Sequence, residues 1–94
     1  MVKVTHIEIV DSHTILCVFS TNERRILDIR KALDTNNRLV KKVLQPAIFK
    51  QAKIGEFGEI LWENAGEIRE LDGSVSSCEY DISPEFAYHH SVAC

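Results

Sequence analysis

Alternating hydrophobic and polar positions mark three strands at the start of the chain. Residues 2–10, 13–20 and 23–29 alternate in this way and are rich in β-branched side chains. Only two residues separate each segment from the next. Because parallel pairing needs a long crossover, connections this short predict an antiparallel meander. The segment 13–20 is apolar on both faces, which predicts a central strand covered on both sides.

Helical spacing replaces this alternation in the middle of the chain. Residues 30–33 predict a helical turn, and the polar segment 34–37 contains residues that can cap the next helix. In residues 38–44 the apolar positions recur at helical spacing, with two adjacent lysines on the outer face. Pro46 predicts that this helix ends or that a second short helix begins.

Residues 51–68 predict a β-hairpin at the centre of the domain. Its two strands flank the loop 56–59, where Gly58 can adopt a positive φ angle. Residues 64–66, Asn-Ala-Gly, tolerate turn geometry, so we expect the second strand to end there. Trp62 is the only tryptophan, which predicts either a buried anchor of the hairpin or a partly exposed interface anchor.

The last third of the chain carries weaker signals. Residues 72–74 predict a turn, and 74–82 an extended segment. Ser, Pro and Glu at 83–85 are typical of the beginning of a helix, here a short one. We therefore predict a single α+β domain over residues 1–94: an antiparallel three-stranded meander, short helices, a β-hairpin and a short C-terminal helix. We expect 72–94 to be loosely attached or packed on a partner subunit.

Composition narrows the classes of protein that fit. At 94 residues and 45% hydrophobic, the chain can build a core but has no room for a large active site with a cofactor, so we expect none. There is no apolar run long enough to cross a membrane and no N-terminal signal pattern. Three widely spaced cysteines, Cys17, Cys78 and Cys94, are typical of reduced thiols and predict a cytoplasmic protein.

Charge is divided unevenly along the chain. Residues 1–55 hold ten Lys/Arg and five Asp/Glu, a net +5, whereas residues 56–94 hold one and nine, a net −8. Either the two parts face each other or a symmetry mate, or the acidic part meets a basic partner. The overall charge of −3 counts against direct binding of nucleic acid. Arg24 and Arg25 are expected on opposite faces of a strand, so they make no single patch.

Few residues suggest catalysis. His89 and His90 lie near Cys94 and form either part of a metal site or a polar tail, since no second ligand pair stands close in sequence. Cys17 fits a buried small hydrophobe better than a nucleophile. The chain has no phosphate-binding loop and no nucleophile elbow. We therefore predict no catalytic residue and no enzyme, with a small metal-dependent or hydrolytic enzyme as the remaining alternative.

Acidic residues gather in sequence around the tryptophan. Glu63, Glu67 and Glu70 follow Trp62, with Asn64 between them. We predict that these five residues form an interaction surface for a protein partner. Self-association as a homodimer is the alternative, because short open sheets leave edges that need covering.

The order of these features resembles a known family, domain-of-unknown-function family 2442, which comprises small bacterial proteins. The residues that carry the resemblance are Phe19, Glu23, Arg25, Leu27, Asp28, Ile29, Phe49, Gly58, Ile60, Trp62, Asn64, Glu67, Ile68, Tyr80, Asp81, Ile82, Ser83, Pro84, Glu85 and Tyr88. The chain departs from the family at Glu63, where relatives often have Pro, and at Ala65, which separates Asn64 from Gly66.

The resemblance implies a compact α+β domain without known catalytic residues. Some relatives look like an N-terminal domain joined to a helix-turn-helix domain, and stand-alone relatives are suspected members of toxin–antitoxin pairs. The expectation is therefore a non-enzymatic protein-interaction module, antitoxin-like or a regulatory partner of a small protein. The alternative is a regulatory domain that acts at DNA through a helix-turn-helix partner.

Overall fold

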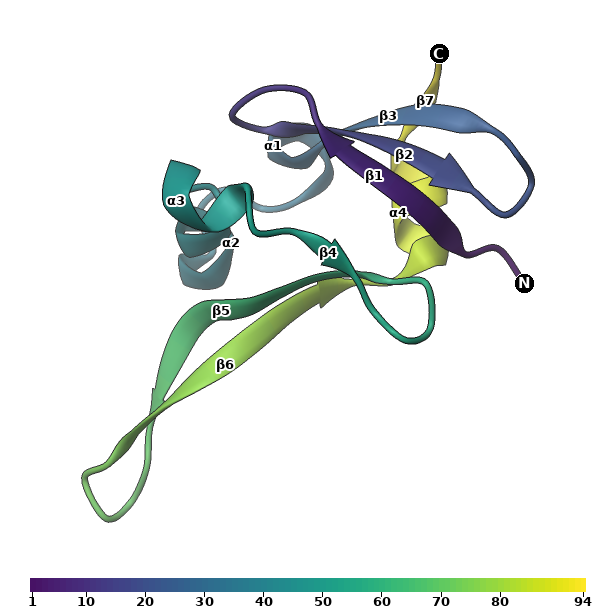
Figure 1. The fold of residues 1–94 in the computed structure, drawn as a ribbon. Coiled ribbons are helices and arrows are strands. Elements are labelled where there is room, and N and C mark those ends of the chain that lie inside the picture. Colours follow the sequence, from purple (N-terminus) through teal and green to yellow (C-terminus); the bar gives the residue numbers. More distant parts are fainter.

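The computed structural model describes the backbone of residues 1–94 and all side chains except that of Ile68. It is an α+β fold with two antiparallel sheets, whose strand orders are β1-β2-β3-β7 and β4-β5-β6. A long hairpin projects from the body of the molecule (Figure 1), and the principal extents are 47 × 24 × 19 Å. In chain order the elements are β1 (Val4–Ile9), β2 (Thr14–Phe19), β3 (Arg24–Asp28), α1 (Ile29–Ala32), α2 (Arg38–Val43), α3 (Pro46–Phe49), β4 (Lys53–Ile54), β5 (Ile60–Arg69), β6 (Val75–Ile82), α4 (Pro84–His90) and β7 (Val92–Ala93).

The predicted meander is confirmed. β1 pairs with β2 and β2 pairs with β3, both antiparallel. Five of the six residues of β2 are buried, so its central position is also confirmed. The two-residue strand β7 adds to the outer edge of β3 through Arg25 and Ile26. The sequence did not predict β7, because a strand this short has no periodicity of its own.

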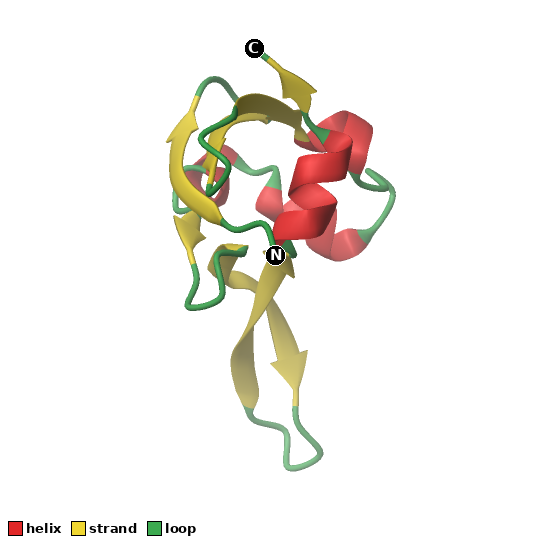
Figure 2. Ribbon diagram, turned by 90° about the vertical axis from the view of Figure 1, so that its right-hand side faces the viewer, coloured by secondary structure: helices red, strands yellow, loops and turns green.

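Local capping chemistry places the helices where the sequence predicts them. The Asn37 side chain accepts hydrogen bonds at the start of α2, including one of 2.9 Å from the amide of Leu39. The Ser83 hydroxyl accepts one of 3.1 Å from the amide of Phe86 at the start of α4. Pro46 is the first residue of α3, where its missing N–H costs nothing. The helices lie on one side of the first sheet (Figure 2).

The core is centred on Trp62. Its side chain is completely buried, and its Nε1 donates a hydrogen bond of 3.1 Å to the carbonyl oxygen of Phe49. The Phe49 ring stacks on it with centroids 6.0 Å apart. Phe19 and Leu27 of the first sheet belong to the same buried cluster. Trp62 is thus the buried anchor, and the alternative prediction of a partly exposed interface anchor is wrong.

The prediction that the strand ends at residues 64–66 is wrong. β5 continues through them and pairs with β6, so that Trp62 faces Tyr80 and Gly66 faces Cys78. Four steps along β5 (62 to 66) therefore match two along β6 (80 to 78), which is a bulge. Ala65 is completely buried and holds the bulge against the core. Asn and Gly serve here to bend a strand, a geometry that uses the same residues as a turn.

Candidate functional site

The outer part of the β5–β6 hairpin, residues 66–78, projects from the body as a two-stranded ribbon (Figure 1); we call it the ribbon. β4 pairs only with Ile60 and Leu61, so the ribbon has no third strand within the described chain. Its backbone edges are therefore open to another chain. A two-stranded hairpin is marginally stable by itself, so a partner that pairs with the ribbon would also stabilise it.

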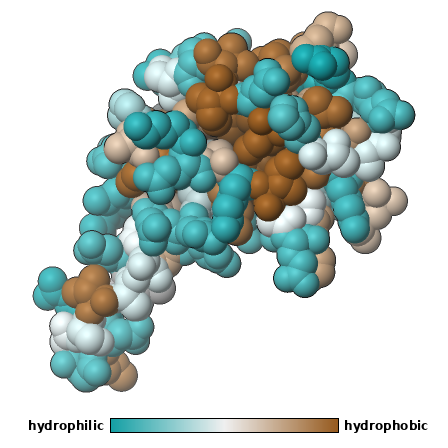
Figure 3. Space-filling view, in the orientation of Figure 1, coloured by the Kyte–Doolittle hydropathy of each residue, from teal (hydrophilic) through white to brown (hydrophobic). Residues whose placement is uncertain are grey.

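The ribbon ends in an apolar side chain between two carboxylates. Leu71 is fully exposed, with Glu70 and Asp72 on either side of it. The Asp72 carboxylate accepts hydrogen bonds from the Ser74 hydroxyl and amide, at 2.6 and 2.9 Å, and these bonds lower its pKa. Gly73 completes the turn with φ of +89°. Figure 3 shows apolar atoms at this end of the molecule, surrounded by hydrophilic ones.

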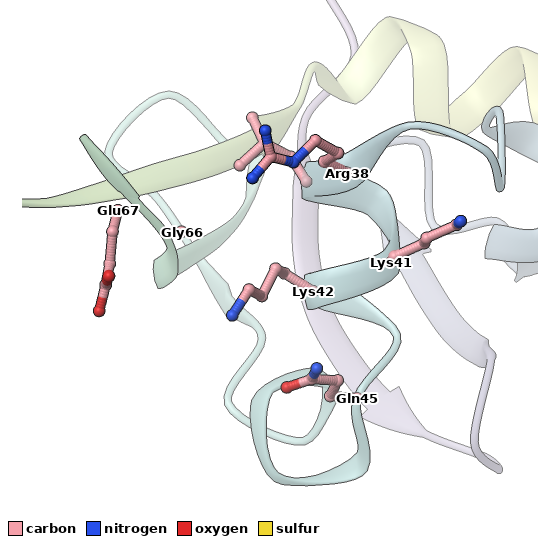
Figure 4. A pocket seen from close by; sticks show the side chains of 7 residues that line it. Arg38, Lys41, Lys42, Gln45, Gly66 and Glu67 are labelled. Carbon is pink, nitrogen blue, oxygen red and sulfur yellow. The ribbon is translucent and has the colours of Figure 1, made fainter. Parts of the chain in front are cut away.

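At the base of the ribbon, α2 and β5 enclose a pocket of about 480 Å³, which we call the basic groove. Its lining residues are Arg38, Leu39, Lys41, Lys42, Gln45, Gly66 and Glu67. Figure 4 shows Arg38 and Lys42 extending from α2 toward the strand that carries Gly66 and Glu67. A second hollow continues the groove along the ribbon to Arg69 and Val75.

The groove combines positive charge with an apolar lining. Arg38 and Lys42 are exposed, and neither forms an ion pair with any side chain that the structure describes. Half-buried Leu39 lies between helix and strand. Gly66 permits this close approach, because a Cβ atom there would lie 2.6 Å from Leu39 Cδ2. The groove is therefore suited to a ligand that is both acidic and aliphatic.

The five residues predicted as an interaction surface do not lie together at one corner of the fold. Trp62 is completely buried and contributes no side-chain surface, so its inclusion in that surface is wrong. Glu63 is exposed and pairs with Lys53 of β4. Asn64 is exposed at the bulge. Because β5 runs on instead of turning, Glu63 and Glu70 are separated by about 20 Å of strand and form no cluster.

The other two predicted residues belong to the ribbon. Glu67 is exposed and lines the basic groove. Glu70 is exposed near the ribbon tip, where its carboxylate accepts a hydrogen bond of 3.0 Å from the Ser76 hydroxyl. The groove residues of α2 were missed from the sequence. The signal was present in the spacing of Arg38 and Lys42 (i, i+4), which places them on one helical face.

Cys17 is placed as the sequence predicts, in the interior. Its thiol is completely buried and donates a long contact of 3.9 Å to the carbonyl oxygen of Ile15. Burial raises the pKa of the Cys17 thiol to about 12. The thiolate that a nucleophilic mechanism needs is therefore not populated near neutral pH.

The C-terminal histidines are exposed and contact aromatic rings. His90 stacks on Phe86 with centroids 4.1 Å apart, and His89 meets the edge of Tyr88 at 5.9 Å. Cys94 is exposed beyond β7. Among the side chains described, no group of three His, Cys, Asp or Glu lies close enough to hold a metal ion.

An Arg–Tyr–Glu cluster fastens α4 and the chain end to the first sheet. The Arg25 guanidinium lies 4.5 Å from the Tyr88 ring centroid, and its Nε donates to the Ser91 hydroxyl at 2.8 Å. The Tyr88 hydroxyl donates a bond of 2.7 Å to Glu23. This bond lowers the pKa of the Glu23 carboxyl and raises the pKa of Tyr88. We interpret the cluster as structural, because its polar atoms form hydrogen bonds with one another.

No protein-family model matches this chain, and no curated protein or solved structure matches it either. The resemblance to family 2442 therefore stays a prediction. Over the part of the chain with described placement, no helix has the length and apolar character needed to cross a bilayer.

Proposed function

We propose that this chain is a non-enzymatic protein-interaction module of the cytoplasm, an antitoxin-like or regulatory partner of a small protein. It binds through the ribbon and the basic groove. The observation that carries the proposal is the ribbon itself, which projects from the core with open backbone edges and a fully exposed Leu71 at its tip.

The binding mode follows from these two features. An open strand edge accepts a further strand through main-chain hydrogen bonds, and exposed side chains beside it select the partner. Val75 is half exposed on β6, and Leu71 is fully exposed. Burying such aliphatic side chains contributes about 1.5–3 kcal/mol each, which is enough to make them central contacts.

The reactive groups of the chain support a binding role and not catalysis. The thiol at Cys17 is held protonated by burial, as described above. Free thiols at Cys78 and Cys94 fit a reducing compartment, which supports the cytoplasmic assignment.

The test is native mass spectrometry of the tagged chain purified gently from its own host. We expect a complex of defined stoichiometry with a second small protein. Leu71→Asp should abolish that complex, because it places a charge where the partner buries an aliphatic side chain. Phe57→Asp is the matched control, since Phe57 is also an exposed apolar side chain but lies in the loop between β4 and β5.

Two results would count against the proposal. One is the recovery of the chain without any second protein at several salt concentrations. The other is a complex that withstands Leu71→Asp, since binding would then use a different surface.

A further inference from the structure

We propose that the basic groove receives the ribbon tip of a second copy of this chain, so that two chains form a symmetric dimer with the tip–groove contact made twice. The inference rests on the proposed function because it uses the same ribbon and basic groove, and it assigns a second copy of this chain to that surface when the other protein is absent.

Groove and tip are chemically complementary. The groove offers the cations of Arg38 and Lys42 together with the apolar side chain of Leu39, and these cations outnumber the single carboxylate of Glu67 that also lines it. The tip offers an exposed leucine, Leu71, between the two carboxylates that flank it. An aliphatic side chain enters the pocket while acidic neighbours meet its basic rim, which is the arrangement of a central anchor with a charged border.

Geometry makes the contact intermolecular. The groove lies at the base of the ribbon, beside Gly66, and the tip lies at its far end. Leu71 follows Gly66 by five residues of extended or turning chain, about 16 Å, so a chain's own tip is held away from its own groove. A two-fold axis through the middle of two antiparallel ribbons places each tip on the other groove. Such an isologous contact closes after two chains.

The pairing also accounts for the divided charge of the sequence. Of the ion pairs among described side chains, only Lys53–Glu63 joins the basic part, residues 1–55, to the acidic part, residues 56–94. Opposite charges in the groove and at the tip are therefore left for an intermolecular contact. In the absence of the partner protein, the same dimer brings the open ribbon edges alongside each other and covers them.

The experiment is a charge exchange in the purified chain, followed by analytical ultracentrifugation. The groove variant is Arg38→Glu with Lys42→Glu. The tip variant is Glu70→Lys with Asp72→Asn, in which the amide oxygen keeps an acceptor for the turn at Ser74. Each variant alone should weaken dimerisation at least about tenfold, because like charges then face each other across both contacts.

An equal mixture of the two variants should dimerise again. In the mixed dimer an unchanged tip meets an unchanged groove on one side, and a positive tip meets a negative groove on the other. Matched controls are Arg30→Glu with Lys31→Glu on α1 and Glu56→Lys in the β4–β5 loop, which change exposed charges elsewhere and should leave the dimer intact. Amide NMR spectra establish that every variant is folded.

The inference is overturned if the unaltered chain is monomeric at all concentrations, if either charge variant dimerises like the unaltered chain, or if the mixture stays monomeric. These failures differ from that of the proposed function. A monomeric purified chain that still yields a Leu71-dependent complex from the host leaves the proposed function standing. If the mixed charge variants dimerise but no second protein is recovered from the host, the inference stands and the proposed function fails.

Discussion

Two glycines with left-handed backbone differ in what surrounds them, and this difference predicts unequal effects of one substitution. Gly58 has φ of +78° and Gly73 has φ of +89°. A Cβ atom at Gly58 would lie 2.6 Å from Lys3 Cβ and 3.1 Å from Lys3 Cα, whereas at Gly73 nothing lies within 4 Å. Replacing Gly58 by alanine is therefore expected to destabilise the domain more than the same replacement at Gly73.

The magnitude has two parts. Alanine in a left-handed conformation costs about 1–2 kcal/mol at either position. At Gly58 the new methyl group also meets the chain at Lys3, including its backbone, which must shift, and overpacking of this kind costs about 1–3 kcal/mol more. Val4 cannot move away freely, because its amide donates a 3.0 Å hydrogen bond to the Gly58 carbonyl oxygen. The expected losses are thus about 2–5 kcal/mol at Gly58 and about 1–2 kcal/mol at Gly73.

The assay is urea denaturation monitored by circular dichroism. The free energies of unfolding of the two variants are compared on condition that the slope of free energy against urea concentration is unchanged. Asparagine serves as a second probe at each position, because it tolerates the left-handed region and still carries a Cβ atom. It should recover most of the loss at Gly73 and little of it at Gly58. Equal losses for the two alanine variants would refute the reasoning, since the contact with Lys3 would then carry no cost.

Three further predictions concern the core and the first sheet. Trp62→Phe should lower the free energy of unfolding by about 2–4 kcal/mol, because it leaves a void and deprives the Phe49 carbonyl oxygen of its donor; a loss below 1 kcal/mol in urea denaturation would contradict this. Tyr88→Phe should raise the pKa of Glu23 toward its ordinary value, measured by NMR titration of the carboxyl carbon. In the unaltered chain the lowered pKa of Glu23 contributes to stability at pH values above the ordinary carboxyl pKa, and this contribution is lost as pH falls through the folded-state pKa. An unchanged titration of Glu23 in the variant would argue against the hydrogen bond from Tyr88. Cys17 should react with a thiol reagent only as fast as the domain unfolds, while the exposed C-terminal thiol reacts at once; rapid modification of both would show that the interior is open.

Local rules were sufficient for much of the fold. Short connections dictated the meander, and the caps at Asn37 and Ser83 set the starts of α2 and α4. At these places the chemistry of a few adjacent residues decides the backbone conformation. The strand end predicted at residues 64–66 failed because Asn and Gly favour turns and bulges alike. The choice depended on β6, which lies later in the chain and is largely polar.

The candidate site was harder to predict, because it is made by contacts between distant segments. Glu67 and Glu70 are on the projecting ribbon as exposed residues, but the cations that accompany them come from α2. Helical spacing could have shown that Arg38 and Lys42 share a face. Only the packing of Leu39 against Gly66 brings that face beside β5.

The bulge at residues 62–66 separates two requirements that one regular strand would have to meet together. Side chains of a strand alternate between faces, so the position of Trp62 in the core would otherwise dictate the direction of every later side chain in β5. Across the bulge, four residues of β5 stand opposite two of β6, so the outer part pairs with β6 in a register shifted by two residues, and this even shift keeps the alternation of faces. A change of one residue in the length of this segment would therefore exchange the two faces of the outer strand and leave the tryptophan in place. Among related sequences, a change in length at this point would change which side chains the ribbon presents to a partner and would leave the residues of the core unchanged.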